Sequence, residues 1–494
     1  MKPLVDQLLD HAQALRWDAL PGGAVQAAVT FITDSVAVGL AGSRHPRLPQ
    51  LLAAAQAWGR GDAAREWASG QRWPVATAAM LNAYQVHNQE FDCVHEAAVV
   101  HPLATILPAL VAQAEAQQLG QGQAVSGAQL IEALVLAVDV ATTLGCAHIA
   151  PMRFFRPAMC GAMGAALGVA KLVGCSRAEM ANALGLAYSQ LAGTMQAHAE
   201  GSPALALQVA LASRAAVMAV DLARAGFAGP HNVIEGPFGY FDLFDAPLTP
   251  RLTQVQQVFA DVFGAAAATW SDDSSRRRGS HSDGNPSGAS HSTRHRITEL
   301  SHKPFPTGRA AHGALDGLAT LQADHGFASE DVAAVELAAP PLILRLVGRP
   351  WRADMDANYA RLCLPYLVAT ALRHGAVTLA HFSPAALADN SLQTLAARVS
   401  CKPNGVTDVN ALAPQTLSVS LCGGQTHSVD LPAVLGHPQR PLSATAQRAK
   451  FDACCAHAGL AGPQRQALHD ACTQLPASTD LLAWLELMRV PFRP

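Results

Sequence analysis

The sequence predicts a mainly α protein that has a large all-helical domain and a smaller α+β domain. The chain has 494 residues, which exceeds what one hydrophobic core usually serves, so two domains are expected. Half of the residues are apolar and 14% are charged, which is typical of a well-buried globular protein. Alanine is abundant and aromatic residues make up only 5%, which favours closely packed helices over most of the length.

The helical pattern runs from about Gln26 to Phe263 and is interrupted by glycines and prolines. Ser126 stands where one helix is expected to begin. Ser176, followed three positions later by Glu179, fits a capping box at the start of another. We therefore assign residues 1–265 to the first part of the helical domain.

Three glycines, Gly161, Gly164 and Gly168, recur on one predicted helix. They are not expected to bind phosphate, because no strand precedes them and no GK[ST] sequence follows. Glycines at this spacing let a neighbouring helix approach closely, so we predict close helix–helix packing there.

A polar segment, Ser271–His295, is rich in Ser, Arg, His and Gly and offers almost nothing to bury. Such composition predicts a disordered insertion, which we assign to residues 266–296. Its three consecutive arginines are more often solvated charge than an RNA-binding arm.

The pattern after this segment changes to short strands. The expected strands are Val332–Ala338, Ala397–Cys401, Thr416–Cys422 and Thr426–Leu431, with a turn at Gly423 and Gly424. A helix is expected among them from about Ala357 to His374. Residues 297–435 are therefore predicted to form a smaller α+β lid domain. Residues 436–494 return to helix and are expected to pack on the first domain.

The charge and the cysteines limit the kinds of partner. A net charge of −3 gives no reason to expect nucleic acid or an anionic membrane. The first twenty residues lack the apolar core of a signal peptide, and the run Leu130–Val140 is too short to span a bilayer. The ten cysteines include no CxxC pair. We expect a cytoplasmic protein with reduced thiols, and no iron–sulfur cluster of the kind some hydratases use.

The densest polar cluster lies between Asn82 and His101. His87 and Glu90 are three residues apart and share one face if helical, where an imidazole and a carboxylate can exchange a proton. His95 and Glu96 begin like a zinc-protease HExxH motif, but position 99 is valine, which excludes that site. The alternative is a buried polar cluster at a helix end.

Two further clusters carry basic side chains. Prolines on either side of Phe305 stiffen the loop that contains Lys303 and Arg309, which favours a functional loop over a merely basic surface. Arg153 and Arg156 lie before another apolar helix, where an unpaired arginine needs either an anionic ligand or an acidic partner such as Glu200. The sequence leaves those two options open.

Together these segments resemble the MmgE/PrpD family, which includes 2-methylcitrate dehydratase, cis-aconitate decarboxylase and iminodisuccinate epimerase. The resemblance rests on six segments in the right order, which are Phe31–Ser43, Asn82–Pro102, Gly161–Gly174, Gly226–Gly239, Lys303–His312 and Leu364–Gly375. It implies a large helical domain built from both ends of the chain, an α+β lid, a homodimer, and a site in the cleft between the domains.

The sequence departs from the family pattern at proton-transfer positions. The family's H-x-x-D-F-D-D run has Glu90 and Cys93 at its first and last acidic positions. Its H-P-T segment begins here with Arg156, and its Thr-Lys pair falls near Ala204 and Leu205, so that lysine is missing. The pattern is closer to the epimerase-like branch than to the dehydratase or decarboxylase branches.

We therefore expect an enzyme that removes the proton α to a carboxylate of a small di- or tricarboxylate, without a metal or another cofactor. The expected catalytic residues are His101 as base, Lys303 as opposing acid or stabiliser, and His87 with Glu90 as orienting groups or second base. The expected substrate-binding residues are Arg156, Arg309, Asp92, His198 and Arg153. The alternatives are a 2-methylcitrate dehydratase-like hydro-lyase and a ligand-binding homologue that has lost its chemistry.

Overall fold

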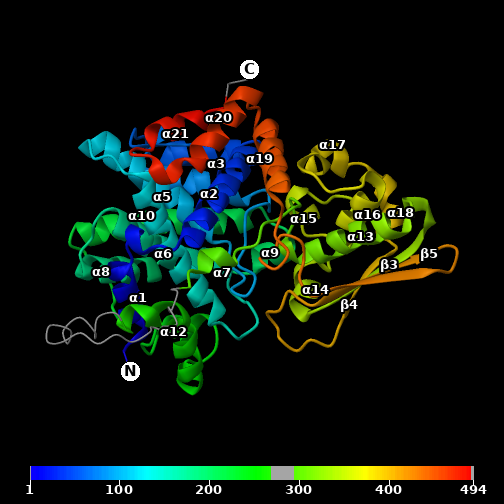
Figure 1. The fold of residues 1–494 in the computed structure, drawn as a ribbon, viewed down its shortest axis with the longest axis horizontal. Coiled ribbons are helices and arrows are strands. Elements are labelled where there is room, and N and C mark those ends of the chain that lie inside the picture. Colours follow the sequence, from blue (N-terminus) through cyan, green and yellow to red (C-terminus); the bar gives the residue numbers. More distant parts are fainter. Residues whose placement is uncertain (1, 269–293, 491–494) are drawn as a thin grey trace, which may run out of the picture.

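The computed structural model describes residues 2–268 and 294–490, and it confirms the predicted fold class. A large helical domain lies beside a smaller domain in which helices cover a sheet, and both marked termini lie on the helical domain (Figure 1). Most of the predicted insertion, residues 269–293, lies outside the described residues. At both ends of that predicted segment, however, the described residues belong to the fold, because a helix continues to Ala268 and His295 is buried.

The helical domain is built from the following helices and one two-stranded hairpin. They are α1 (Leu4–Ala14), α2 (Gly22–Gly42), α3 (Leu48–Trp58), β1 (Ala64–Arg65), β2 (Arg72–Trp73), α4 (Val75–His87), α5 (Pro102–Gln121), α6 (Gly127–Cys146), α7 (Arg156–Leu172), α8 (Arg177–Tyr188), α9 (Gln196–Glu200), α10 (Ala204–Arg224), α11 (Tyr240–Phe244) and α12 (Leu252–Ala268). Short 3₁₀ turns join some of them, at Trp17–Ala19 and Thr249–Arg251.

Helix starts follow the capping chemistry that the sequence predicts. Ser176 accepts a hydrogen bond from the backbone N–H of Glu179, whose carboxylate reaches back to the Ser176 N–H at 2.7 Å. Ser126 and Gln129 form the same reciprocal pair at the start of α6. Each pair satisfies backbone donors that a helix N-terminus otherwise leaves without a partner.

The glycines of α7 pack against neighbouring helices, as the sequence predicts. A Cβ at Gly164 would lie 2.3 Å from the carbonyl oxygen of Ala137 in α6, and one at Gly161 would lie 2.6 Å from the Thr105 hydroxyl in α5. The absence of a Cβ therefore lets α5, α6 and α7 approach closely, and almost every residue of α5 to α7 that faces this contact is buried.

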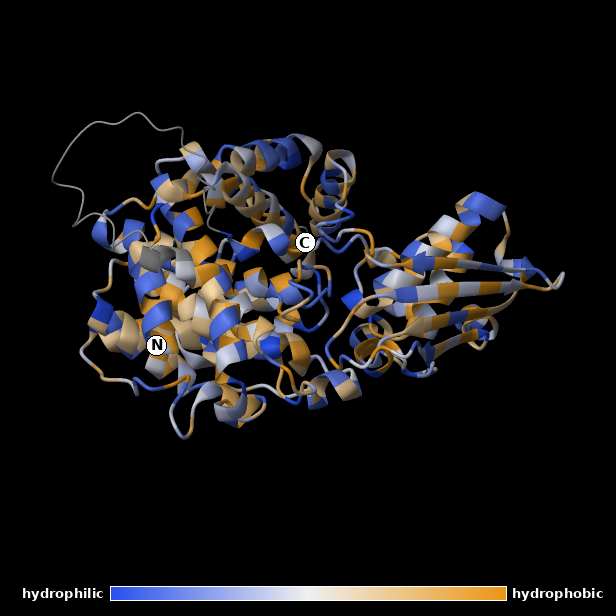
Figure 2. Cartoon of the chain, turned by 60° about the horizontal axis from the view of Figure 1, so that its bottom comes forward, coloured by the Kyte–Doolittle hydropathy of each residue, from blue (hydrophilic) through white to orange (hydrophobic). Residues whose placement is uncertain are grey.

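The lid contains a four-stranded sheet in the order β4-β3-β5-β6. Its strands are β3 (Val332–Ala339), β4 (Val399–Pro403), β5 (Gln415–Leu421) and β6 (Thr426–Leu431). The pair β3–β4 is parallel and the other pairs are antiparallel. Along the strands hydrophobic and hydrophilic residues alternate, because one face of the sheet packs on helices (Figure 2).

The helices of the lid are α13 (His312–His325), α14 (Pro341–Val347), α15 (Ala357–Ala360), α16 (Leu364–His374), α17 (Pro384–Leu387) and α18 (Gln393–Ala396), with 3₁₀ turns at Arg309–Ala311, Ser329–Asp331, Leu379–Phe382 and Asn390–Leu392. The 3₁₀ turn Arg296–Glu299, which the sequence assigns to the lid from residue 297, packs instead against α2 and α6 of the helical domain. Two local predictions were inexact. The predicted strand 397–401 is shifted by two residues in β4. The predicted helix 357–374 is broken between α15 and α16, because proline at position 365 fits only the first turn of a new helix.

The C-terminal helices are α19 (Ala444–Ala458), α20 (Gly462–Thr473) and α21 (Leu482–Leu487), with a 3₁₀ turn at Leu475–Ala477. They lie back on the helical domain, where α19 and α20 contact α2 (Figure 1). The two hydrophobic cores are distinct, yet Val99 and Met152 of the helical domain belong to the core of the lid. Apolar contacts therefore contribute to the interface between the two domains.

Three helices, α2, α6 and α10, are long and apolar enough to cross a membrane by length and composition. The sequence argument from the short run 130–140 therefore does not hold, because α6 extends over twenty residues. In the structure 72%, 83% and 56% of their most apolar windows are buried within the protein. Their apolar faces form the core of the helical domain.

Gly164→Ala is expected to destabilise the protein by about 1–3 kcal/mol, because the new methyl group would press on the backbone of α6. The free energy of unfolding in denaturant measures this. Gly23→Ala is the matched control, since a Cβ at that position of α2 meets no atom within 4 Å. Equal stability of both variants would contradict the close packing of α6 and α7.

Candidate active site

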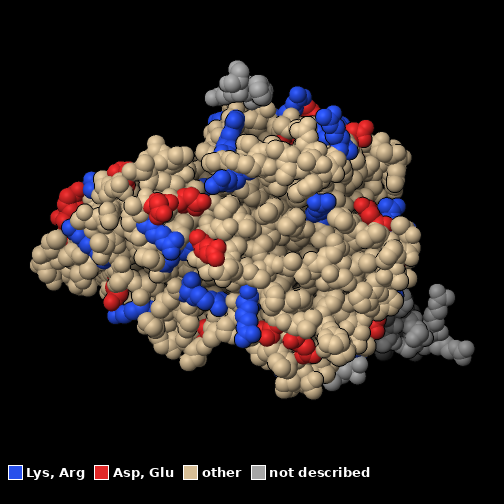
Figure 3. Space-filling view, turned by 180° about the vertical axis from the view of Figure 1, so that it is seen from behind, with Lys and Arg blue, Asp and Glu red and all other residues tan. Residues whose placement is uncertain are grey.

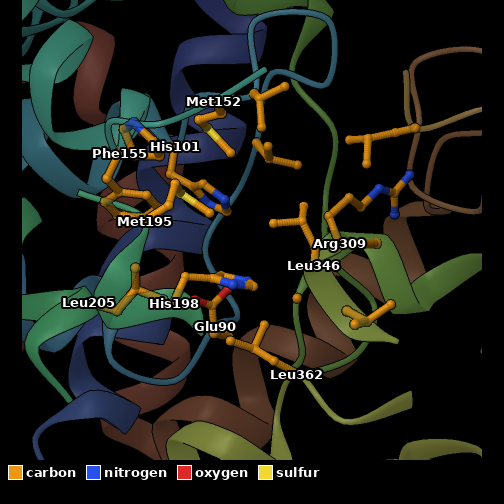
Figure 4. Close-up of a pocket in the computed structure, with 17 residues that line it drawn as sticks. Glu90, His101, Met152, Phe155, Met195, His198, Leu205, Arg309, Leu346 and Leu362 are labelled. Carbon is orange, nitrogen blue, oxygen red and sulfur yellow. The ribbon is translucent and has the colours of Figure 1, made fainter. Parts of the chain in front are cut away.

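A small cavity lies between the helical domain and the lid, with a volume of about 50 Å³. Figure 4 shows the rings of His101 and His198 directed toward this space, with Glu90 beside them. The lining residues are Glu90, Val94, Val99, His101, Met152, Phe155, Pro157, Met195, His198, Leu205, Gly308, Arg309, Ala310, Leu346, Val347, Leu362 and Leu412. A water molecule needs about 10–15 Å³ of such volume, so the cavity as it stands has room for a few water molecules.

Two histidines share one buried carboxylate at the wall of this cavity. The Nδ1 atoms of His87 and His101 lie 2.9 Å and 3.1 Å from the same Oδ2 atom of Asp92. Because the carboxylate can only accept, both rings carry their proton on Nδ1 toward Asp92. His101 precedes α5 and His87 ends α4, so the two helix ends fix the two rings. The structure thus brings together three of the predicted site residues.

The two rings have opposite pKa shifts. Burial alone would lower the pKa of His87, but the neighbouring Asp92 carboxylate raises it above its usual value. Burial lowers the pKa of His101, and the attraction of Asp92 does not overcome this effect. Burial would raise the pKa of Asp92, but His87, His101 and Lys303 hold it well below its usual range. At neutral pH His101 is therefore an unprotonated imidazole beside an ionised carboxylate, which suits a general base.

Glu90 faces the cavity in a strained backbone conformation. Its φ angle is 50°, and Lys303 donates hydrogen bonds to its carbonyl oxygen at 3.1 Å and to its carboxylate at 3.0 Å. Burial would raise the pKa of Glu90, but the Lys303 ammonium lowers it to about 2. Val99 also lines the cavity with a positive φ of 53°. Such conformations cost about 1–3 kcal/mol and concentrate at functional sites.

Lys303 is wholly buried and does not line the cavity. The residues Val94 and Ser301 form an antiparallel bridge, with N···O distances of 3.1 Å and 2.7 Å, that carries the Lys303 loop alongside Glu90. Its ammonium also lies 3.8 Å from Asp92 Oδ1. As found, Lys303 holds the two carboxylates in place rather than facing a substrate.

Arg309, predicted to hold a substrate carboxylate, lines the cavity but has its donors directed to protein atoms. Its Nε and Nη2 donate to Glu96 at 3.0 Å and 2.8 Å, and the remaining donors reach carbonyl oxygens of Val434, Leu435 and His302. Figure 4 shows its guanidinium turned away from the two cavity histidines. The pairing satisfies a buried cation within the protein, so Arg309 fastens the lid to the segment that contains Glu96.

The two arginines at the start of α7 lie in different surroundings, because Arg153 precedes the helix and Arg156 is its first residue. Arg153 is exposed, and Arg156 is buried with its Nη2 bonded to Ala150 O and Asn410 Oδ1. Neither lines the cavity, and Glu200 is not the partner of Arg156. The Nε and Nη1 of Arg156 have no hydrogen-bond partner among the described residues. The predicted clamp of two arginines on one anion is therefore not present at this cavity.

His198, predicted to bind substrate, lines the cavity. Arg349, which the sequence did not indicate, lies behind it. Arg349 Nη2 donates to His198 Nδ1 at 3.2 Å and to the His198 carbonyl at 2.7 Å. Burial and this neighbouring cation lower the pKa of His198 to about 4. Arg349 carries no motif in the sequence, since the contact joins segments 151 residues apart.

Two groups of side chains have donor atoms close enough for a metal ion. They are His87 with Asp92 and His101, and His11 with Asp139 and His295. In both groups, each histidine nitrogen nearest the carboxylate already forms a hydrogen bond to its Oδ2 atom. The hydrogen bonds to Oδ2 hold each group together, whereas His87 Nε2 and Asp92 Oδ1 have no hydrogen-bond partner among the described residues.

The fold and the site define a two-domain protein with a buried histidine–aspartate pair at the interface of a helical domain and an α+β lid. The chain belongs to the MmgE/PrpD family of enzymes, because the model of the MmgE/PrpD N-terminal domain matches residues 6–253 and that of the C-terminal domain matches residues 305–475. It is 26% identical over 406 residues to a cis-aconitate decarboxylase-like protein of Aspergillus oryzae, which covers 80% of this chain and 78% of the relative. It is also 27% identical over 242 residues to the cis-aconitate decarboxylase of Aspergillus terreus, about half of each chain.

Glu96→Gln and Arg309→Gln are each expected to lower the free energy of unfolding by about 3–5 kcal/mol, since each leaves a buried charge without its partner. The double variant is expected to cost much less than the sum, because the removed groups interact directly. Chemical denaturation of the four proteins measures this coupling. If the two losses in free energy of unfolding are additive, or if Arg309→Gln changes only substrate binding, Arg309 would be a substrate-binding residue.

Proposed function

We propose that this enzyme removes a proton from the carbon next to a substrate carboxylate, with His101 as the base. The observation that carries the proposal is the geometry of His101: its Nδ1 is fixed on Asp92, and its Nε2 forms no hydrogen bond to a described residue while the ring lines the cavity. An imidazole held by a carboxylate in this way presents its lone pair to a bound substrate.

In the proposed step, the Nε2 lone pair takes the α-proton and the C–H electron pair moves toward the carboxylate, which gives an enediolate. Return of a proton to the other face completes an epimerisation. Departure of a β-substituent with its bonding electrons, as hydroxide that then takes a proton, gives an alkene and water. His101 becomes a cation when it takes the proton. The ionised Asp92 beside it stabilises this protonated form.

The relatives' names contain decarboxylase, whereas the sequence pattern favours an epimerase-like reaction. A decarboxylation would break the bond to a carboxylate instead, release carbon dioxide and leave its electron pair on carbon for protonation by His101 in its acid form. Proton transfer at a carbon next to a carboxylate is common to all three outcomes. A lyase and an isomerase would therefore both use this step.

His101→Gln is expected to lower the rate of α-proton exchange by about 10²–10⁴-fold without unfolding the protein, because it removes the base. Deuterium incorporation in D₂O, followed by proton NMR, measures the exchange with a panel of iminodisuccinate, 2-methylcitrate, citrate and cis-aconitate. Deuterium without an alkene signal indicates an epimerase, and a new alkene indicates a lyase.

The matched control is His231→Gln, since His231 is exposed and bonds only to Asn182. In the wild type the exchange rate should fall with acid only below the usual histidine pKa of about 6.5, because burial lowers the pKa of His101. Full exchange in His101→Gln would contradict the assignment. Binding without exchange of any substrate would favour the alternative of a ligand-binding homologue.

We also propose that the protein forms a homodimer through α10. Leu211, Met218 and Leu222 are 43%, 36% and 38% exposed and recur on one face of this helix. Broad areas of the surface carry few charged side chains (Figure 3), and solvent-exposed apolar stripes are typical of interfaces.

The double variant Leu211→Lys/Met218→Lys is expected to run as a monomer in size-exclusion chromatography with light scattering, because it places charge within the proposed contact. Leu243→Lys, which alters an exposed leucine of α11, is the control and should leave the mass of the particle unchanged. A monomeric wild type would overturn this proposal.

A further inference from the structure

We infer that His198 stabilises the enediolate by donating a hydrogen bond to its oxygen, and that Arg349 is the positioning residue that prepares His198 for this role. The inference rests on the proposed function, because the enediolate forms only if His101 removes the α-proton. Three observations carry it: the nitrogen of His198 that holds the ring proton, the place of that ring at the cavity, and the cation behind it.

The ring of His198 carries its proton on the nitrogen that is free to meet a ligand. A guanidinium group can only donate, so Nδ1 of His198 accepts the hydrogen bond from Arg349 Nη2 at 3.2 Å. The proton of the neutral ring therefore lies on Nε2. This Nε2 forms no hydrogen bond to a described residue, and the residue lines the cavity.

His101 and His198 thus present complementary groups to one space, into which Figure 4 shows both rings directed. His101 donates from Nδ1 to Asp92 and has its lone pair on Nε2, whereas His198 has an N–H at that position. As His101 takes the α-proton, the C–H electron pair moves onto the carboxylate, and His198 donates to the oxygen that gains the charge. No proton leaves His198. Its hydrogen bond strengthens as the charge grows, so it favours the transition state over the bound substrate.

Arg349 holds this arrangement from the lid. Its Nη2 also donates to the carbonyl oxygen of His198 at 2.7 Å, and its guanidinium carbon lies 4.9 Å from the centroid of the Tyr359 ring. The same tyrosine packs on the end of α9, where a Cβ at Gly201 would lie 2.9 Å from it. His198 belongs to α9 of the helical domain, and Arg349 follows α14 of the lid. The contact between the two domains therefore sets which nitrogen of His198 carries the proton.

The positive charge of Arg349 is not neutralised within the protein. Arg349 has no carboxylate partner among the residues that the structure describes, and its buried Nη1 has no hydrogen-bond partner there. A buried cation without a counter-charge is costly. An enediolate beside His198 supplies the missing negative charge, and the cation behind the ring makes the Nε2–H a stronger donor to it.

The ring of His198 stays neutral at the pH values at which His101 acts as a base. Burial and the Arg349 cation lower the pKa of His198 to about 4, and Arg345 acts in the same direction, whereas Glu90 opposes them. A neutral imidazole can stabilise a developing negative charge without giving up its proton. His198 should therefore add no ionisation to the pH dependence of exchange in the histidine range, near pH ~6.5.

Nitrogen-15 NMR of the histidine rings tests the arrangement without any substrate. In the neutral protein His101 is expected to hold its proton on Nδ1 and His198 on Nε2, with signals assigned by their loss in His101→Gln and His198→Gln. Arg349→Leu removes the donor to Nδ1, so His198 should then populate both tautomers and its pKa should rise. A proton on Nδ1 of His198 in the wild type, or an unchanged ring in Arg349→Leu, would overturn the inference.

Deuterium exchange with the substrate panel tests the role in the reaction. His198→Leu removes the donor and is expected to lower kcat for exchange by about 10²–10³-fold, with a smaller change in KM. His198→Gln keeps an amide donor near the position of Nε2 and should retain more of the rate. Arg349→Leu should lower kcat as well, and Arg349→Lys, which keeps a charged donor, should recover part of it. His231→Leu, which alters an exposed histidine, is the matched control.

The outcomes separate this inference from the proposed function. Full exchange in His198→Leu, or a rise in KM with unchanged kcat, would overturn the inference and leave proton removal by His101 standing. If His198→Leu does not fold, His198→Asn replaces it, because the shorter amide does not reach the position of Nε2 and should be slower than His198→Gln. Absence of exchange in the wild type with every substrate would contradict the proposed function and this inference with it.

Discussion

The site depends on one buried carboxylate. Asp92 is inaccessible to solvent, and an ionised group in such a place is stable only when charges and donors surround it. His87, His101 and Lys303 supply them from a helix end, a helix start and the loop into the lid. The bridge between Val94 and Ser301 and the strained backbone of Glu90 follow from this requirement, since both bring the Lys303 loop to the two carboxylates.

Much of the fold could be predicted from the sequence because local signals agree with the tertiary structure. Alanine-rich helical periodicity, the capping box at Ser176 and the alternating strands of the lid depend on neighbours within a few residues. The glycines of α7 were recognisable because no phosphate-binding context surrounds them. The break before α16 was missed, although the proline at position 365 marks it, because helical periodicity continues across the break.

The composition of the site was only partly predictable, and the reason is physical. His87, Glu90 and His101 lie within fifteen residues, so their grouping is visible in the sequence, and Asp92 lies between them. The partners of Arg309 and Arg156 are settled by contacts more than two hundred residues away along the chain, with Glu96 and Asn410. An arginine that binds substrate and one that fastens a lid have the same appearance in a sequence. Only the three-dimensional structure shows which donors are already used.

The fastening of the lid also bears on how a substrate gains room. Arg309 joins Glu96 to the carbonyl oxygens of Val434 and Leu435, which lie where the chain leaves the lid. A rigid swing of the lid would have to break these bonds and expose two buried charges, which is costly. Rotation of Met152 and Met195 breaks no hydrogen bond of their side chains and exchanges one apolar contact for another. We therefore expect the cavity to enlarge chiefly by repacking of its walls.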